Sequence, residues 1–518
     1  MKIVSVQEMR EIERIADLNG CSYTTMLENA GTNLGKWVNR QFSCLKNHFA
    51  IGLVGSGNNG GDTLVALDYL AKNGWFSVAY LVKPRSQDDI YLKRLLESGG
   101  HVISVENDLE FIKFKGLISH KAVILDGILG TGFIKPMESH LFLCMKSISS
   151  TISEHRNNLH VIAVDTPSGV DCDLGTVSDY VINADYTACM EAVKAGLIKF
   201  PANDFVGEII RIEIGLPPQN SILDNKEFEL IGAGYVKSNL PKRPNDSHKG
   251  SFGTSLIYAG SESYVGATYL SAKAAYYSGA GLVHVLTKRF VLAALSGALV
   301  EVIWTTIDHL DQATLEIAIL KASSMLIGPG IDLSKNSCLL FERLLVTIKK
   351  IKPTMPVIID ADGLRHLSRI KNWHEMFSPL DIILTPHPGE LAILTGKSIK
   401  EIQSDRILTA TYFAKKWQKT VCLKGANTVI AFSDGHAVVS NAATAALATA
   451  GTGDILAGLI SGYCAQGVNS EIAAVVATYI HAEAGKLSGR IKGQNASVIA
   501  SDVLEAIPLV LAELNTGN

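Results

Sequence analysis

One short motif in the C-terminal half of this 518-residue chain combines a phosphate-binding turn with a carboxylate. It reads Ala450-Gly451-Thr452-Gly453-Asp454 and opens an apolar, helix-like stretch. Small residues at a helix start leave main-chain N–H groups free to bind a phosphate, which the helix dipole also favours. Asp454 would then lie where it can take a proton from an attacking hydroxyl group, unless it is only a first-turn acid that complements the dipole.

A second glycine-rich turn follows an apolar run in the N-terminal half. Gly55 to Gly60 matches G-x-G-x-x-G, the pattern of a dinucleotide-binding turn. The acidic residue expected about 20 residues later is replaced by a segment ending in Lys83, so the pattern does not favour an oxidoreductase. A plain turn that needs glycine is the alternative, but it does not explain the polar groups that open the next helix, Asn58-Asn59-Gly60-Gly61-Asp62.

Two more apolar runs of the N-terminal half end in polar groups. Asp126 ends one run before a glycine turn at Gly130 and Gly132, and Asp165 ends another three residues before Ser168. Each alone is more often a capping residue. Because ligands bind at the carboxyl ends of strands in open α/β sheets, we expect all three strand ends to converge on one site.

The elements that would position these groups are those of two unlike α/β domains. Residues 6–40 are expected to be helical, with a possible helix end at 29–31, and Val- and Ile-rich runs without alternation favour parallel strands buried on both faces. The expected strands are 49–54, 76–82, 122–125, 160–164, 209–214, 255–258, 282–286, 325–327, 357–359, 382–384 and 421–423. Three helices are expected from about 454, 470 and 500. Glycines and prolines that interrupt the regular elements place the domain boundary near 216–240. The two domains are therefore expected at 1–220 and 225–515.

Composition excludes several classes of protein. The apolar content of 47% and charged content of 19% are typical of a packed globular protein. A net charge of −3 gives no reason to expect nucleic acid or an anionic membrane as a partner, and no window is apolar enough for a membrane span. Eight scattered cysteines and a charged N-terminus predict a cytoplasmic protein with reduced thiols. Two large domains joined by a short linker lead us to expect a homo-oligomer.

The three N-terminal motifs together resemble those of the YjeF N-terminal domain, the NAD(P)H-hydrate epimerases, over about residues 1–217. The resemblance implies a Rossmann-like three-layer fold and interconversion of the R and S forms of hydrated NADH or NADPH, with a bound potassium ion. It implies Asn59, Asp126 and Ser168 as the potassium ligands, which suits a hard cation. Asp165 is our expected acid–base residue, with Lys135 assisting. The substrate-binding residues implied are Asn58, Asn59, Gly60, Gly61, Asp62, Gly130, Thr131, Gly132, Phe133, Ile134, Lys135, Pro136 and Asp165. Thr63 departs from the family's usual glycine but removes no functional group.

The Gly-Thr-Gly-Asp element resembles that of the ribokinase-like superfamily, in which this aspartate is the base. Seven further motifs precede this element in the chain, at 248–253, 264–267, 278–281, 328–330, 360–364, 385–390 and 424–428. This set resembles the ADP-dependent NAD(P)H-hydrate dehydratases, the YjeF C-terminal domain, over about residues 245–510. The N-terminal resemblance supports it, because the two domains occur fused in a bifunctional nicotinamide repair enzyme.

The second resemblance implies a phosphoryl transfer followed by an elimination. The β-phosphoryl group of ADP converts the ring hydroxyl of the hydrate into a good leaving group, and loss of phosphate restores the double bond. Asp454 would take the hydroxyl proton and Mg²⁺ would neutralise phosphate charge. The hydrated nicotinamide would contact Ala267, Gly330, His387 and Asp454. The AMP portion would contact Lys424, Gly425, Ala426, Asn427, Thr428 and Gly453.

Some alternatives remain open at this point. His387 lies between two prolines and could be a rigid surface turn. Residues 441–447 lack the family's Gly-Asn-Pro-Gly-like stretch, which predicts a loop of different shape. The main alternative function is an ATP-dependent, ribokinase-like small-molecule kinase with an N-terminal nucleotide-binding module. An interaction protein with decayed sites is less favoured, because all four aspartates of the motifs are intact, namely Asp62, Asp126, Asp165 and Asp454.

Overall fold

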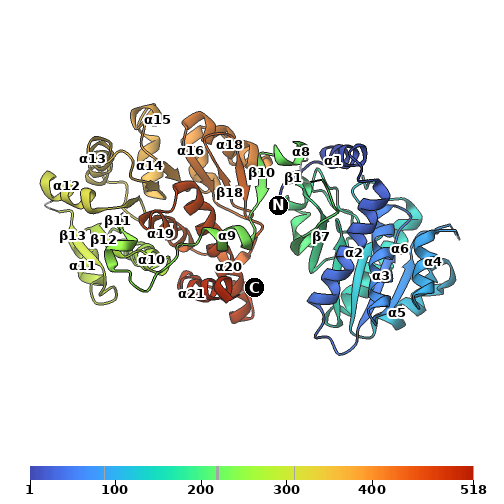
Figure 1. Cartoon of the computed structure of the whole chain (residues 1–518). Coiled ribbons are helices and arrows are strands. Elements are labelled where there is room, and N and C mark those ends of the chain that lie inside the picture. Colours follow the sequence, from blue (N-terminus) through green and yellow to red (C-terminus); the bar gives the residue numbers. More distant parts are fainter. Residues whose placement is uncertain (87, 218–220, 309, 517–518) are drawn as a thin grey trace. The chain divides into compact units, whose positions relative to one another are not determined.

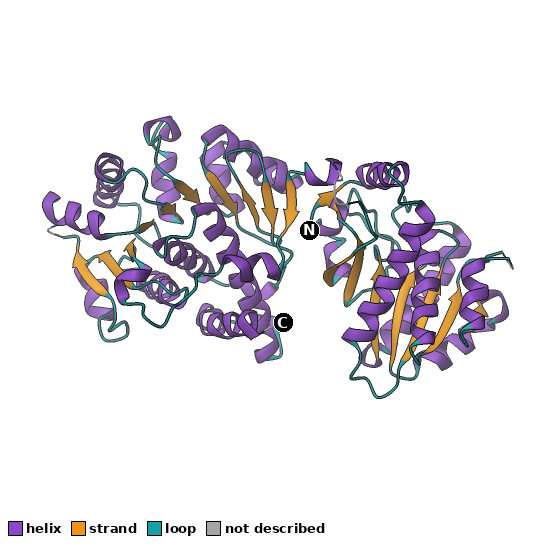
Figure 2. Cartoon of the chain, in the orientation of Figure 1, coloured by secondary structure: helices purple, strands orange, loops and turns teal. Residues whose placement is uncertain are grey.

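The computed structural model describes residues 1–518 except 87, 218–220, 309 and 517–518, and divides the chain into two compact units (Figure 1). The first unit is Met1–Lys226 and the second is Glu227–Asn518. Each unit has helices packed around a sheet (Figure 2). All eight cysteines are free thiols. No helix among the described residues is long and apolar enough to cross a membrane.

The first unit is built on a parallel, seven-stranded sheet with the order β4-β3-β2-β5-β6-β7-β9. Alternate residues of the central strand β2 belong to two different cores, with Ala50 and Val54 on one face and Ile51 and Leu53 on the other. This explains the continuous apolar runs, and it confirms the expected parallel sheet that is buried on both faces. The strands are β2 (Phe49–Val54), β3 (Phe76–Leu81), β4 (His101–Ser104), β5 (Ala122–Gly127), β6 (Leu159–Val164), β7 (Tyr186–Met190) and β9 (Glu208–Ile212).

Helices cover both faces of this sheet. One core contains apolar residues of α1 (Val6–Leu18), α2 (Tyr23–Gln41) and α3 (Asn58–Lys72), and the other contains residues of α5 (Ile112–Ile118) and α6 (Ser139–Glu154). A separate two-stranded parallel sheet pairs β1 (Ile3–Val4) with β8 (Val193–Lys194). The remaining helices are α4 (Ile90–Glu97), α7 (Asn203–Val206) and α8 (Ser221–Asp224).

The expected helix end at residues 29–31 is wrong. Helix α2 continues through Gly31 to Gln41. A Cβ atom at Gly31 would lie 2.4 Å from the Cβ atom of Val65 and 2.6 Å from the carbonyl oxygen of Asp62. Glycine therefore serves close packing of α2 against α3, whose first turn carries the candidate site, and does not mark a helix terminus.

The second unit has a ten-stranded sheet with the order β10-β19-β18-β17-β16-β15-β14-β11-β12-β13. The pairs β17–β18 and β18–β19 are antiparallel and the others are parallel. The strands are β10 (Phe228–Leu230), β11 (Thr254–Tyr258), β12 (Leu282–Thr287), β13 (Ile303–Thr306), β14 (Ser324–Ile327), β15 (Val357–Ile359), β16 (Ile382–Leu384), β17 (Thr420–Leu423), β18 (Val429–Ala431) and β19 (Ala437–Val439).

One face of this sheet packs against a single apolar core that includes residues of α10 (Val265–Tyr277), α19 (Thr452–Ala465), α20 (Ser470–Lys492) and α21 (Ala500–Thr516). The other helices are α9 (Ala233–Asn239), α11 (Arg289–Leu295), α12 (Gln312–Lys321), α13 (Lys335–Ile351), α14 (Asp362–Ser368), α15 (Trp373–Met376), α16 (Pro388–Thr395), α17 (Ile399–Ser404) and α18 (Arg406–Trp417). Helices begin near the predicted positions 454, 470 and 500.

Candidate active sites

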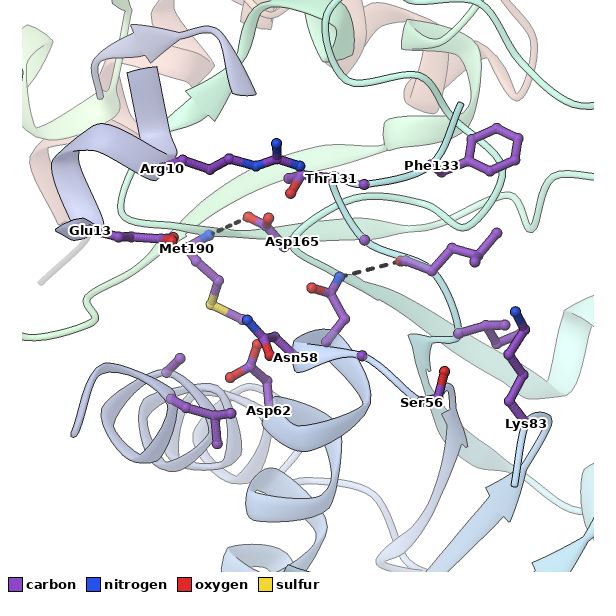
Figure 3. A pocket seen from close by; sticks show the side chains of 18 of the residues that line it. Arg10, Glu13, Ser56, Asn58, Asp62, Lys83, Thr131, Phe133, Asp165 and Met190 are labelled. Atoms are coloured by element: carbon purple, nitrogen blue, oxygen red, sulfur yellow. Dashed lines mark hydrogen bonds between the residues drawn. The ribbon is translucent and has the colours of Figure 1, made fainter. Parts of the chain in front are cut away.

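The first unit contains a cavity of about 760 Å³ at the carboxyl edge of its sheet. The cavity is lined by the turn after β2, by the segment after β5, and by Asp165, which follows β6. Arg10 and Glu13 reach it from α1 (Figure 3). The structure therefore brings together the three strand ends that carry the N-terminal motifs.

Most of the predicted substrate residues line this cavity. They are Asn58, Asn59, Asp62, Gly130, Thr131, Gly132, Phe133, Ile134, Pro136 and Asp165. Gly60 and Gly61 do not line it. A Cβ atom at Gly60 would lie 2.1 Å from the carbonyl oxygen of Gly55, and one at Gly61 would lie 3.0 Å from Leu27. These two glycines allow close packing beneath the turn and offer no side chain to a ligand.

The lysine that contacts Asp165 is Lys194, whereas the predicted partner, Lys135, is exposed and does not line the cavity. Lys194 has only 1% of its side chain exposed and forms an ion pair with Asp165. Burial by itself would lower the pKa of Lys194, but the negative charge of Asp165 outweighs it, and the pKa is raised. Asp165 also accepts a 2.9 Å hydrogen bond from the main-chain N–H of Met190 and has φ +66°. Asp165 therefore lines the cavity with a buried lysine as its partner.

Two further carboxyl groups of the cavity hold their protons more tightly than usual. Burial and the charge of Asp165 raise the pKa of Asp62 well above its usual value. Burial also raises the pKa of Glu13, against the opposing charge of Lys194. The cavity thus combines a charged Lys–Asp pair with carboxyl groups that can donate protons, an arrangement that suits acid–base chemistry.

Of the predicted potassium ligands, Asn59 lines the cavity, whereas Asp126 and Ser168 are buried and hydrogen-bonded to each other. Ser168 donates from its hydroxyl and main-chain N–H groups to the two oxygens of Asp126, at 2.5 and 2.8 Å. Burial raises the pKa of the Asp126 carboxyl group to about 6. The amide nitrogen of Asn59 lies 2.6 Å from the carbonyl oxygen of Val164 and 3.3 Å from that of Leu129. Rotating the Asn59 amide by half a turn would place its oxygen beside the carbonyl oxygens of Val164 and Leu129. Three oxygens side by side are the ligands that a hard cation requires.

The second unit places four ionisable groups together at the carboxyl edge of its sheet. Asp360 follows β15, Lys424 follows β17, and Glu390 and Asp454 lie in the first turns of α16 and α19. The ammonium nitrogen of Lys424 lies 2.5 Å from Asp360 and 3.9 Å from Glu390. Thr385 also donates to Asp360, at 2.7 Å. The partly exposed Lys424 thus pairs with Asp360, lies near Glu390 and interacts electrostatically with Asp454.

This surplus of negative charge shifts the proton affinities of the site. Burial and the charge of Asp360 raise the pKa of Asp454 to about 7, against the opposing charge of Lys424. Burial likewise raises the pKa of Glu390 to about 7. A general base works best with a pKa near the working pH, and Asp454 meets that condition.

Five of the predicted nucleotide-binding residues, 424–428, form the hairpin turn between β17 and β18. Positive φ angles at Gly425 (+145°) and Asn427 (+54°) shape the turn, and Arg406 donates to the carbonyl oxygens of Leu423 and Lys424 from behind. A Cβ atom at Gly453 would lie 3.3 Å from the Lys424 ammonium nitrogen. The turn and the start of α19 are therefore neighbours, as a phosphate-bearing ligand bound by both would require.

The predicted hydrate-binding residues lie at the same edge. A Cβ atom at Gly330 would lie 3.2 Å from that of Ala267. His387 caps α16, accepts from the main-chain N–H groups of Gly389 and Glu390, and has 52% of its side chain exposed. The structure thus supports the turn-forming role of His387, and it also places the ring 3.4 Å from Glu390.

The residues missed by sequence reasoning are those whose partners are distant in the chain. The motifs alone indicate no role for Lys194, Glu13, Asp360 or Glu390. Lys194 does leave a signal, since it is a single lysine within the apolar stretch 192–198. Asp360 and Glu390 lie in motifs that the sequence already marks, but spacing alone does not show that they meet Lys424.

Comparison with known proteins covers both units. A family model described as NAD(P)H-hydrate dehydratase matches residues 255–509, and one described as YjeF-related protein N-terminus matches residues 23–196. A bifunctional NAD(P)H-hydrate repair enzyme Nnr from Moorella thermoacetica is 31% identical over 99% of this chain and 97% of its own length. Another from Coxiella burnetii is 31% identical over 96% of each chain. An ADP/ATP-dependent NAD(P)H-hydrate dehydratase from Bacillus subtilis, co-crystallized with ATP/Mg²⁺, is 28% identical and covers 55% of this chain and 98% of its own, with a TM-score of 0.47.

The buried pair of the first unit can be tested by removing one charge. Lys194→Met leaves the Asp165 carboxylate buried without its partner, so we expect the free energy of unfolding of this unit to fall by about 3–5 kcal/mol. The double variant Lys194→Met/Asp165→Asn should recover most of that loss. Hydrogen exchange of peptides from β5 and β6 measures both, and Lys115→Met, at an exposed lysine, should change the free energy by less than about 0.5 kcal/mol. Equal losses in the single and double variants would show that charge pairing is not the stabilising interaction.

Proposed function

The chain belongs to the family of bifunctional NAD(P)H-hydrate repair enzymes, and from this premise we propose how its residues act in each unit. The first unit interconverts the R and S hydrates of NADH and NADPH. The second unit dehydrates the S form and converts ADP to AMP and phosphate. The observation that carries the second assignment is Asp454, a buried carboxyl group with a pKa of about 7 beside a lysine and a phosphate-binding turn.

In the dehydratase unit Asp454 acts as the general base. It takes the proton of the ring hydroxyl as the hydroxyl oxygen bonds to the β-phosphorus of ADP, and the bond from that phosphorus to the AMP oxygen breaks. The carbon–oxygen bond of the phosphorylated hydrate then breaks, inorganic phosphate leaves, and loss of a ring proton forms the double bond. N–H groups at the start of α19 and the charge of Lys424 stabilise the transferred group. Residues 424–428 and Gly453 bind the AMP portion, and Ala267, Gly330 and His387 contact the hydrated ring.

Mg²⁺ fits this site because its negative charge is not balanced. Asp360, Glu390 and Asp454 face a single lysine, and Glu390 has a pKa of about 7, so its ionised form is poorly stabilised by the residues alone. Asp360 and Glu390 supply carboxylate oxygens of the kind that Mg²⁺ binds. Bound there, the ion would neutralise charge on the diphosphate of ADP.

In the epimerase unit Asp165 is the central acid–base residue, and we assign Lys194 as the group that holds its charge and Asp62 as a nearby proton donor. Epimerisation moves protons to and from the hydrate, and these two carboxyl groups line the cavity, one ion-paired with Lys194 and the other with a raised pKa. The carboxylate of Asp126, the hydroxyl of Ser168 and the amide oxygen of Asn59 would hold potassium. Lys135 as an assisting residue has no support in the described contacts and stays a prediction.

The alternative function, an ATP-dependent small-molecule kinase with an N-terminal binding module, is not favoured. A kinase needs only the second site, whereas the first unit presents its own cavity with acid–base groups and the whole chain matches bifunctional relatives. A homo-oligomer and a cytoplasmic location remain predictions of the sequence.

The two activities are separated by an assay with mixed R and S hydrates of NADH plus ADP. The wild-type protein should regenerate NADH completely, as measured by the absorbance of NADH. Asp454→Asn should slow regeneration by about 10²–10⁴-fold, because the general base is lost, while R–S exchange observed by chromatography continues. Asp434→Asn, at an exposed aspartate of the same unit, is the matched control and should regenerate NADH at the wild-type rate. Loss of both activities in Asp454→Asn would contradict separate sites.

The raised pKa of Asp454 predicts the pH dependence of dehydration. Burial raises the pKa of this base to about 7, so kcat/KM should rise from pH 6 to pH 8 as Asp454 loses its proton. Because burial raises the pKa of Glu390 to a similar value, the profile is repeated with Glu390→Gln. The rise should persist at lower overall activity. A flat profile in Glu390→Gln would assign the titration to Glu390 and remove the support for Asp454.

The potassium proposal predicts a dependence of epimerisation on the monovalent cation. Replacing K⁺ by tetramethylammonium should slow R–S exchange, because the cation that offsets the buried Asp126 carboxylate is lost. Ser168→Ala should raise the K⁺ concentration needed for half-maximal rate by about 10–100-fold. Dehydration by the second unit serves as the internal reference, and an epimerisation rate independent of the cation would overturn the assignment.

A further inference from the structure

A second large cavity lies in the dehydratase unit, away from the groups that carry the reaction. Its volume is about 1310 Å³. It is lined by the segment before β11, by the turn between α10 and β12, and by Tyr463 and Gln466 at the end of α19. Asp454 lies in the first turn of the same helix, roughly 14 Å from Tyr463 along the axis. The cavity is therefore at the amino edge of the sheet and the reaction site at the carboxyl edge.

This cavity contains a motif that the proposed reaction does not use. Residues 248–253, His-Lys-Gly-Ser-Phe-Gly, form part of its wall and lead into β11. Close packing requires the last glycine of this motif, because a Cβ atom at Gly253 would lie 1.9 Å from the carbonyl oxygen of Ala465. Close packing does not explain the charged side chains of the same segment.

The lining is strongly basic. Five of its residues are cationic or can become so, namely Lys237, Lys242, Arg243, His248 and Lys249. None of the described lining residues is an aspartate or a glutamate. Asp246 belongs to the same loop but does not line the cavity. In a chain with a net charge of −3, such a concentration of positive charge in a concave surface is a local property of this cavity.

Two of these side chains are held in place and two are available. Arg243 lies 4.1 Å above the ring of Phe252 and donates to the carbonyl oxygen of Gly279. His248 accepts from the N–H of Gly250 through Nδ1, so its other nitrogen carries the proton in the neutral ring. Lys242 and Lys249 are exposed, and neither forms an ion pair with a described residue. The cavity thus combines fixed donors with unpaired charges.

We propose that this basic cavity binds a ligand that carries a chain of two or more phosphates, either a nucleotide or an inorganic polyphosphate. A ligand with one negative charge could balance only one of Lys242, Arg243 and Lys249, whereas a phosphate chain offers several charges and acceptors along its length. The concave shape suits a small molecule, and walls formed by Pro241, Pro244 and Tyr276 could also hold a ring. The proposal is independent of the reaction at Asp454.

The test is a titration of the full chain with inorganic triphosphate. Calorimetry measures the binding, and hydrogen exchange locates it. Triphosphate should bind and protect peptides from 237–252 and 276–281. Lys242→Glu/Lys249→Glu should weaken this binding by roughly tenfold or more for each reversed charge. The matched control is Lys400→Glu/Lys415→Glu, which makes the same change in net charge at exposed lysines outside the cavity and should bind as the wild type does. Thermal unfolding shows that each variant is folded, and the milder Lys242→Ala/Lys249→Ala replaces the reversal if it is not.

Titration with ATP, read at the same peptides, distinguishes the two sources of the phosphate chain. Protection at lower concentrations than with triphosphate assigns a nucleotide, and protection at equal or higher concentrations assigns a polyphosphate. The proposal is overturned if triphosphate does not bind, if it protects only peptides around 424–428 and 450–456, or if the control variant weakens binding as much as the cavity variant does.

Discussion

An ion pair between a lysine and an aspartate at the carboxyl ends of parallel strands is the interaction on which both sites depend. Lys194 pairs with Asp165 in the first unit and Lys424 with Asp360 in the second. A buried ion pair is costly to desolvate and is weak evidence for stability by itself. Its effect on the neighbouring carboxyl group is what matters for function. In each unit the aspartate's charge and burial together raise the pKa of a nearby acid, Asp62 in one and Asp454 in the other.

The topology explains why this arrangement occurs twice in unlike domains. Carboxyl ends of parallel strands meet at one edge, so polar residues that are far apart in sequence come together without any long loop. In the first unit this edge collects Asp126 and Asp165, and in the second it collects Asp360 and Lys424. Each edge then holds more carboxyl groups than lysines. Surplus buried negative charge needs a cation or a proton, which connects the proposed K⁺ and Mg²⁺ sites with the raised pKa values.

Local sequence patterns predicted the strands and turns that are marked by apolar runs or by glycine. They did not predict features that depend on contacts between residues far apart in the chain. Apolar runs predicted most of the sheet strands. Strands β4, β7, β10 and β13 mix polar with apolar residues and were missed, and so were the short antiparallel strands β18 and β19. Gly31 was read as a helix end although its role is to let α3 approach α2. Lys194 was missed as the partner of Asp165 for a similar reason. Its importance comes from a contact with Asp165, 29 residues earlier in the chain, that no motif marks, whereas the exposed Lys135 belongs to the marked segment 130–136.

Contacts around Thr452 show what holds the turn at the Gly-Thr-Gly-Asp element. Residues 441–447 lack the glycines and proline expected from the family, and the structure has a short 3₁₀ turn there, Ala445–Leu447, with Ala446 buried. The hydroxyl of Thr452 donates to the carbonyl oxygens of Leu447 and Thr449, at 2.9 and 3.0 Å. These bonds tie the incoming chain to the first residue of α19, while Gly451 takes the left-handed conformation that turns the chain into the helix. The phosphate-binding turn is thus held by a hydroxyl and a single glycine, and the position of Asp454 depends on these two residues more than on the composition of the loop before them.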